Sequence, residues 1–202
     1  MSPTLTFYTN PHSRGRIARW MLEEVGADYE TEVLDYGTTM KAPEYLAINP
    51  MGKVPAIRHG DAVVTEVAAI CAYLADAFPD AGLAPSLNDR ARYYRWLFFA
   101  AGPLESAVVN TALGFEVPAD RQVMAGYGSL PTALDALETA LADSEFVAGD
   151  SFTAADVYVG AQVSWGLQFG TIEKREAFVD YAERATDREA YRRANELDGP
   201  MG

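Results

Sequence analysis

The sequence is poor in the residues that build disulfides and transition-metal sites. Its 202 residues include one cysteine, Cys71, and two histidines, His12 and His59. A single cysteine excludes an intrachain disulfide. The sequence contains no HExxH motif, no Cys–His cluster and no Walker loop for binding phosphate. We therefore expect neither a metal nor a nucleotide cofactor.

Positive charge and long hydrophobic runs are also scarce. The chain has 16 Lys and Arg against 29 Asp and Glu, a net charge of −13. Such a chain is a poor partner for nucleic acid or for an anionic membrane. No apolar run approaches the roughly 20 residues of a membrane span, and the amino terminus lacks the basic and apolar regions of a signal peptide. We expect a cytoplasmic protein that binds neither nucleic acid nor membrane.

Hydrophobic residues make up 49% of the chain, enough for a substantial core. Up to residue 78, short β-rich runs alternate with amphipathic ones, which predicts strands at 4–8, 29–34, 54–59 and 62–64. Helices are expected at 13–25 and, after a cap at Thr65, up to residue 77. The predicted element order is βαβ followed by ββα.

The remainder of the chain reads as a linker and a set of helices. Residues 79–88 are rich in proline and glycine, which is typical of a linker. The helices beyond it are expected at about 89–112, bent at Gly102 and Pro103, and at about 120–141, 153–169, 175–185 and 187–197. Thr153 and Asp156 form a capping-box pattern at the start of a helix that is apolar on nearly all sides. That helix should be buried.

The segment NPMGKVPAI at 49–57 is the most informative part of the sequence. Pro55 opens a strand and we predict a cis peptide bond before it, because a proline there often marks a tight turn. This arrangement exposes the backbone of Val54 to an extended peptide. Glu66 follows at the start of an apolar helix, where backbone N–H groups attract anions.

These two motifs, in this order, resemble the amino-terminal half of the glutathione S-transferases. The family pattern reads Asn-Pro-x-Gly-x-Val-Pro, then Glu-Ser at a helix start. Here Asn49, Gly52 and Glu66 match, and Val67 replaces the serine. The cap at Thr153 is also similar to the family's carboxy-terminal domain. The resemblance covers nearly the whole chain, and a bacterial, serine-type or theta-like member fits best.

The resemblance implies an α/β plus all-α fold. A thioredoxin-like, glutathione-binding domain is expected at 1–78, a linker at 79–88, and an all-helical domain that forms the electrophile pocket at 89–202. The implied activity is glutathione transfer in detoxification. Glutathione would be the co-substrate, its thiolate would attack a hydrophobic small molecule, and the protein would be a homodimer.

Activation of the glutathione thiol is expected at the start of the first helix. A free thiol has a pKa near ~8.5 and only the thiolate is nucleophilic. A hydroxyl, a helix amino terminus and a nearby cation all favour the thiolate. Ser13 is the first candidate for the hydroxyl, Tyr8 the second and Thr9 the third, with Arg14 and Arg16 as the cations. As alternatives, Ser13 is an ordinary helix cap and Tyr8 is a packed strand-end aromatic. His12 is a candidate general base, with an exposed loop residue as its alternative.

The same resemblance assigns the rest of the glutathione site. Val54 would form two backbone hydrogen bonds to the cysteinyl part, in a geometry set by Pro55. Glu66 would accept from the γ-glutamyl ammonium. Val67 retains only its N–H for the γ-glutamyl carboxylate, because the family's hydroxyl is missing.

Two lysines and four residues of the helical region complete the expected sites. Lys41 and Lys53 are candidates for the glycyl carboxylate, although Met40 stands where related proteins often have a polar residue. Both lysines are otherwise solvated surface. The candidates for an apolar electrophile pocket are Tyr94, Phe98, Asn110 and Trp165.

Two other functions fit the same residues. The first is a non-catalytic binding or interaction module that keeps the fold, which Val67 and Met40 favour. The second is a glutathione-dependent peroxidase or reductase. A reductase of this kind normally needs a cysteine near position 13, and Cys71 instead falls on the inward face of a predicted helix.

Overall fold

The computed structural model describes residues 4–201 and forms two compact units. One unit contains the chain up to Leu83 together with everything from Arg188 onward. The other unit contains Ala84–Asp187. The contacts of the last helix lie within the first unit. The assignment of all residues from 89 to 202 to one helical domain stays a prediction.

The first unit is built on a four-stranded sheet with the order β2-β1-β3-β4. β1 runs parallel to β2 and antiparallel to β3, and β3 runs antiparallel to β4. The strands are β1 Leu5–Thr9, β2 Glu30–Val33, β3 Ala56–His59 and β4 Ala62–Thr65. This topology agrees with the expected βαβ and ββα order and with a thioredoxin-like unit.

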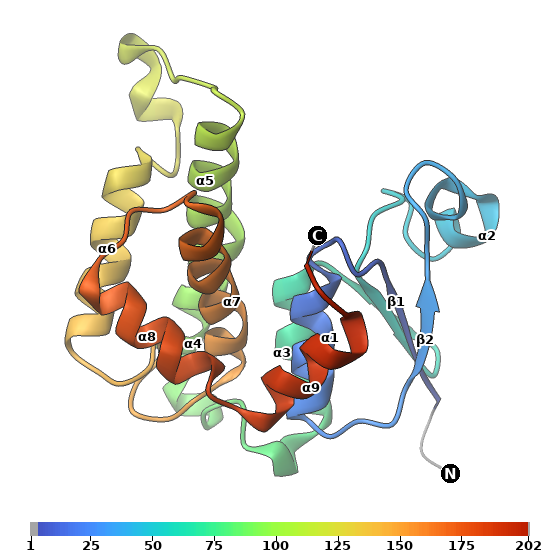
Figure 1. Ribbon diagram of the computed structural model, residues 1–202. Helices are drawn as coiled ribbons and strands as arrows, with labels where there is room; N and C mark the ends of the chain where they lie inside the picture. The colour runs from blue at the N-terminus through green and yellow to red at the C-terminus, as the bar shows by residue number, and fades with distance from the viewer. Residues whose placement is uncertain (1–3, 202) are drawn as a thin grey trace. The chain divides into compact units, whose positions relative to one another are not determined.

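Three helices lie on one side of this sheet (Figure 1). They are α1 Gly15–Glu24, α3 Val67–Ala77 and α9 Glu189–Asp198, and a fourth, short helix is α2 Pro43–Leu46. α1 buries Ile17, Trp20 and Met21, since their 3- and 4-residue spacing places them on one face. α9 packs along α1, where the Tyr191 ring meets the edge of Trp20.

The start of α3 differs from the prediction. The capping position is occupied by Glu66, not Thr65, and the Glu66 side chain forms no cap hydrogen bond. Thr65 is instead the last residue of β4 and pairs with Ala56 of β3. The pairing extends the strand by one residue, so the expected cap lies inside the sheet.

The second unit is built of helices, as the sequence predicts, with one isolated β-bridge between Phe146 and Gly149. Its elements are α4 Arg90–Phe99, a π-helical turn Ala100–Leu104, α5 Glu105–Ala112, a 3₁₀ turn Ala119–Met124, α6 Leu130–Ala142, α7 Ala154–Phe169 and α8 Glu176–Thr186. The expected bend around Gly102 and Pro103 is the π-helical turn. The helix predicted from residue 120 starts only at Leu130, because Gly128 has a left-handed φ of 68° and Ser129 caps the helix.

The capping box of α7 is confirmed. The Thr153 hydroxyl accepts from the Ala155 N–H, and the Asp156 carboxylate accepts from the Thr153 N–H at 2.9 Å. Asp156 is fully buried and also accepts from the Val147 N–H and the Tyr181 hydroxyl. Within residues 4–201, no helix is long and apolar enough to cross a membrane.

Candidate functional site

The register of the sheet brings three expected site segments to one end of it. Tyr8 pairs with Ala56, and Ala56 pairs with Thr65, so these residues lie on one rung across β1, β3 and β4. One residue further, the chain leaves β1 into the loop 10–13, enters β3 from 54–55, and leaves β4 at Glu66. Adjacent strands lie about 4.8 Å apart, which places the three segments side by side.

Ser13 lies half-buried just before α1. Its hydroxyl donates to the Asn10 carbonyl at 2.6 Å and accepts from the Gly15 N–H at 2.9 Å. Arg14 is the capping residue of the helix and its side chain forms no cap bond. Ser13 therefore stands at the positive end of α1 and donates its hydroxyl proton to a backbone carbonyl.

The loop 10–13 is anchored by two residues that the sequence analysis did not single out as functional. The buried Asn10 amide donates to the Leu34 carbonyl at 2.8 Å, and its oxygen accepts from the His12 N–H. The exposed Tyr36 hydroxyl donates to the His12 carbonyl. The turn-forming tendency of Asn before Pro was a signal for Asn10, whereas nothing local predicted Tyr36.

Thr9 and Gly15 pack directly against each other beneath Ser13. Thr9 is fully buried, and its hydroxyl has no hydrogen-bond partner among the described residues. A Cβ atom at Gly15 would lie 2.0 Å from the Thr9 hydroxyl and 2.9 Å from that of Ser13. Any side chain at position 15 would therefore push α1 away from both hydroxyls.

Tyr8 points to the other face of the sheet. Strand alternation separates it from Phe7, whose ring lies under Arg19 of α1. Tyr8 is 1% exposed and packs in a cluster with Met40, Tyr45 and other apolar residues. Its hydroxyl has no hydrogen-bond partner among residues 4–201, and burial raises its pKa, an effect that the nearby Arg58 opposes.

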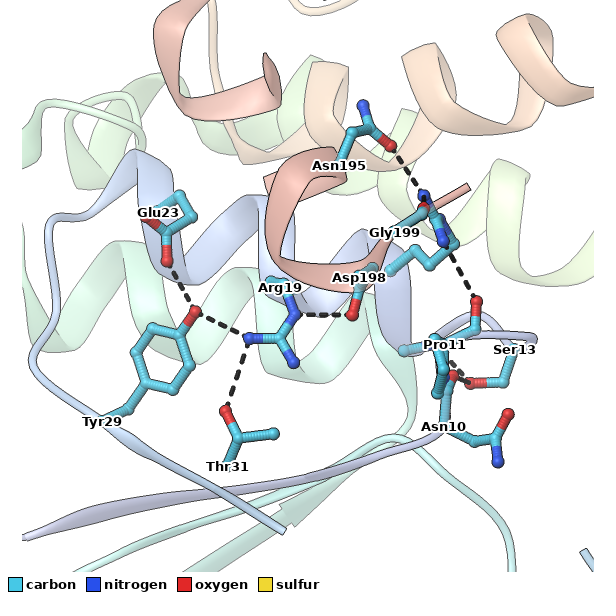
Figure 2. A network of polar contacts seen from close by, with 12 residues as sticks. Asn10, Pro11, Ser13, Arg19, Glu23, Tyr29, Thr31, Asn195, Asp198 and Gly199 are labelled. Carbon is cyan, nitrogen blue, oxygen red and sulfur yellow. Dashed lines mark hydrogen bonds and ion pairs between the residues drawn. The ribbon is translucent and has the colours of Figure 1, made fainter. Parts of the chain in front are cut away.

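The cations near Ser13 differ in where they point. Arg14 is exposed, and so is His12. The buried Arg16 guanidinium donates to the Pro11 carbonyl at 3.3 Å and to the Asn195 side chain and the Gly199 carbonyl of the last helical segment. Figure 2 shows this network around residues 10–13. The thiolate-stabilising roles expected for Arg14 and Arg16 stay predictions.

The segment before β3 has the expected backbone. The peptide bond between Val54 and Pro55 is cis, which confirms the prediction. Within the described chain, neither the N–H nor the C=O of Val54 forms a backbone hydrogen bond. The Tyr45 hydroxyl and the Asn49 amide both donate to the Lys53 carbonyl. These bonds hold the segment while the Val54 backbone stays open to an extended ligand.

Glu66 and Val67 form the third segment. Glu66 is exposed and has a φ of 66°, a left-handed value that is uncommon for a residue with a side chain. Its carbonyl accepts from the Ile70 N–H and so begins α3. The side chain of Val67 is buried. The first N–H groups of α3 have no partner within the helix, which makes them donors for an anion.

The two lysines and Met40 behave differently from one another. Lys53 is exposed. The Lys41 ammonium donates to the carbonyls of Met51 and Gly52, at 3.2 and 2.7 Å, and so closes the loop before Lys53. Met40 is 1% exposed and belongs to the cluster around Tyr8. A polar side chain at position 40 would therefore be enclosed in that core.

The four electrophile-pocket candidates all lie in the second unit. Tyr94 and the largely exposed Phe98 lie one turn apart on α4 with their rings 6.3 Å apart. Asn110 on α5 donates to the Tyr127 hydroxyl, and Trp165 lies half-buried on α7. The structure brings together Tyr94 and Phe98. That the four residues line one pocket stays a prediction.

No group of three or more His, Cys, Asp or Glu side chains within residues 4–201 is arranged to hold a metal ion. Cys71 lies fully buried in α3. Burial raises the pKa of its thiol to about 12, so the thiol is protonated at neutral pH. The candidate site is therefore described by its three segments alone. They offer hydroxyls, open backbone groups and two helix amino termini at one end of the sheet.

Comparison with known families gives two matches along the chain. Residues 13–77 match the family described as glutathione S-transferase, N-terminal domain. Residues 119–165 match glutathione S-transferase, C-terminal domain. The first match begins at Ser13, the last residue of the loop 10–13, and contains the segments 54–55 and 66–67.

Relatives of known sequence and structure agree with these matches. Glutathione S-transferase F10 of Arabidopsis thaliana is 32% identical over 166 residues, which cover 76% of each chain. A glutathione transferase structure from Methylococcus capsulatus strain Bath has a TM-score of 0.80 at 30% identity and covers 97% of this chain and 99% of its own. A sphingomonad glutathione S-transferase complexed with glutathione has a TM-score of 0.77 at 29% identity, over 96% and 98%.

A different type of protein is also similar. Elongation factor 1-gamma of Prunus avium is 32% identical over 148 residues, or 71% of this chain. The chain spans only 34% of the length of that protein. Sequences similar to this chain therefore occur both in glutathione S-transferases and within the longer elongation factor 1-gamma.

Proposed function

This chain belongs to the glutathione S-transferase family, and on that premise we propose that it binds glutathione and transfers it to a hydrophobic electrophile. The observation that supports this most is the rung formed by Tyr8, Ala56 and Thr65. Because of that register, an open backbone segment and two helix amino termini converge at one end of the sheet. A peptide with a thiol, an ammonium and carboxylates matches this set of groups.

The proposed binding mode follows the three segments. The N–H and C=O of Val54 pair with the cysteinyl residue of glutathione, as in an added strand. The exposed carboxylate of Glu66 accepts from the γ-glutamyl ammonium, and the N–H of Val67 donates to the γ-glutamyl carboxylate. In this mode the exposed Lys53 attracts the glycyl carboxylate. Lys41 has the same proposed role, in competition with its two carbonyl partners.

The proposed chemistry depends on the Ser13 hydroxyl. It turns from the Asn10 carbonyl and donates to the glutathione sulfur, which, together with the α1 amino terminus, favours the thiolate. The thiol proton leaves to solvent. The sulfur then forms a bond to an electrophilic carbon, and the leaving group departs with its bonding electrons. We prefer Ser13 to Tyr8 because the Tyr8 hydroxyl is enclosed by the chain. Membership of the serine-type class stays a prediction.

The electrophile site and the quaternary structure are proposed in less detail. Tyr94, Phe98, Asn110 and Trp165 offer an apolar surface with one amide, which suits hydrophobic electrophiles. A cytoplasmic location remains a prediction. So does the homodimer, for which light scattering of the purified protein should give twice the mass of one 22.0 kDa chain. A mass near one chain at micromolar concentration would contradict it.

Calorimetric titration with glutathione, followed by the absorbance of the bound thiolate, tests the proposed function. Saturable binding and turnover of an aryl halide are expected. Ser13→Ala should raise the pKa of the bound thiol by roughly one unit or more. A larger loss of turnover in Tyr8→Phe than in Ser13→Ala transfers the role to Tyr8. If millimolar glutathione does not bind, the proposal is wrong.

Two observations favour a second candidate function, a non-catalytic glutathione-binding or interaction module. Val67 lacks the hydroxyl that the family pattern has at this position, and a similar region occurs in the elongation factor 1-gamma of Prunus avium. The same titration separates the two functions. Saturable binding without turnover of any tested halide, enone or peroxide supports the module.

A further inference from the structure

α1 and α9 pack side by side in opposite directions, and different contacts join their two ends. At the carboxyl end of α1, Glu24 pairs with Arg188 and Glu23 with Arg193. At its amino end, beside Ser13, the partners come from the end of α9 and just beyond. We call the segment 195–199 the terminal clasp; Figure 2 shows it against α1 and the loop 10–13.

Two buried arginines of α1 hold the clasp. The Arg19 Nε donates to the Asp198 carboxylate at 2.7 Å, and both side chains are almost fully buried. Arg16, one turn nearer Ser13, donates to the Asn195 side chain at 3.0 Å and to the Gly199 carbonyl at 2.8 Å. The segments so joined lie 179 and 183 residues apart in the chain.

Arg16 has partners unlike those of an ordinary buried ion pair. It is 7% exposed, yet its three acceptors are the neutral oxygens of Pro11, Asn195 and Gly199. Burying a charge without a bonded carboxylate costs stability, so a gain in stability does not explain this arrangement. The planar guanidinium, however, donates in fixed directions. Its contacts therefore define the relative position of the groups it joins.

The third acceptor connects the clasp to the site. The Pro11 carbonyl belongs to the loop 10–13, which also contains the Asn10 carbonyl and Ser13. The Ser13 hydroxyl bonds to the Asn10 carbonyl, and the Ser13 N–H also donates to that carbonyl. A shift of this loop by a fraction of an ångström would turn the hydroxyl away from a bound sulfur. The bond from Arg16 to Pro11 adds nothing to the packing of α9 on α1.

We propose that the terminal clasp is a positioning element for Ser13. Asn195 and the Gly199 carbonyl orient the Arg16 guanidinium, which fixes the Pro11 carbonyl and with it the loop that carries the hydroxyl. In this role Arg16 and Asn195 are positioning residues: Arg16 acts on the thiol through the loop 10–13, and the role does not require the direct contact with the thiolate that the sequence analysis expects of it. This role rests on the proposed glutathione chemistry, but the ordering of the loop does not.

The test compares two variants of the full chain that weaken opposite ends of the α1–α9 contact. Asn195→Ala removes one acceptor of Arg16 at the site end. Arg188→Gln, the matched control, removes the ion pair to Glu24 at the far end. Asn195→Asp restores an acceptor at position 195. Hydrogen exchange of the amides from His12 to Ile17 is measured without ligand, and the pKa of the bound glutathione thiol is measured with it.

In Asn195→Ala, these amides should exchange about tenfold faster than in the natural chain, because a bond to a charged group is lost. The bound thiol should have a higher pKa, and kcat should fall more than KM rises. Asn195→Asp should restore the slow exchange, and Arg188→Gln should change neither the exchange nor the thiol pKa.

Two results overturn the proposal. One is unchanged exchange at residues 12–17 in Asn195→Ala, which rejects the clasp whether or not glutathione binds. The other is an equal effect of Asn195→Ala and Arg188→Gln, which assigns the effect to general docking of α9. If faster exchange occurs in a protein that does not bind glutathione, the clasp orders the loop and the proposed function is wrong.

Discussion

Val67 is the residue at which this chain departs most clearly from the glutathione-binding pattern. Its side chain is buried at the first position of α3. In the proposed binding mode, only its N–H contacts the γ-glutamyl carboxylate. Val67→Thr keeps the branched shape and adds a hydroxyl. A hydrogen bond to a charged group contributes roughly 1.5–3 kcal/mol, which predicts about tenfold or greater tightening of glutathione binding in calorimetry.

Val67→Ala is the matched control for that prediction, because it changes the side chain without adding a hydroxyl. It should lower the melting temperature through the lost apolar contacts and leave the glutathione affinity no tighter. Equal affinities of the threonine and alanine variants would mean that a hydroxyl at position 67 does not contact the γ-glutamyl carboxylate.

The Cys71 thiol should be unreactive in the folded protein. The thiol is fully buried, and burial raises its pKa to about 12, so the reactive thiolate is nearly absent at neutral pH. Ellman's reagent should therefore label about one thiol per chain in guanidinium and none within minutes in buffer. Rapid labelling of the native protein, or loss of activity in Cys71→Ala, would instead support the alternative of a glutathione-dependent reductase.

At the scale of single elements, α7 depends most on its cap. The Asp156 carboxylate receives bonds from Val147, Thr153 and Tyr181 in a fully buried position. Asp156→Ala leaves these donors without an acceptor, and each buried unsatisfied group costs about 1–3 kcal/mol. We expect a loss on the order of 3 kcal/mol or more in the free energy of unfolding, measured by urea denaturation.

Ser129 at the start of α6 provides the comparison for that loss. Its hydroxyl also caps a helix, accepting from the Thr132 N–H, but the side chain is exposed. Ser129→Ala should cost only about 1 kcal/mol, because water replaces the lost partner. If both variants lost the same stability, burial would not be what makes the α7 cap important.

For the whole molecule, stability should fall in alkaline solution for an identifiable reason. Burial raises the pKa of both Tyr29 and Tyr45 to about 12, whereas an unfolded tyrosine has a pKa near ~10. Below pH 10 both states keep the proton. As the pH rises from 10 towards 12, the unfolded chain releases it first, so the free energy of unfolding decreases.

The slope should be about 1.4 kcal/mol per pH unit for each such tyrosine. Tyr45→Phe removes one of the two contributions. The stability difference between the natural chain and this variant, from urea denaturation, should be constant up to pH 10 and should shrink above it. A constant difference at pH 11 would show that the Tyr45 hydroxyl is not protected.

The sequence by itself determined the features that local chemistry specifies. Alternation and helical periodicity predicted every strand and most helices, and the motif around Pro55 predicted the cis bond that the structure has. Glu66 and the capping box at Thr153 were likewise recognisable within a few residues. The boundary errors, at Thr65 and before Leu130, arose where strand pairing or a left-handed glycine overrode propensity.

Only the tertiary structure decided which groups come together and which are enclosed. Strand pairing joins residues 10–13, 54–55 and 66–67 at one end of the sheet, and the pleat turns Tyr8 away from α1. The partners of Arg16 lie 179 and 183 residues away along the chain. No local pattern encodes such contacts, because they arise when two amphipathic helices pack and buried donors must find acceptors.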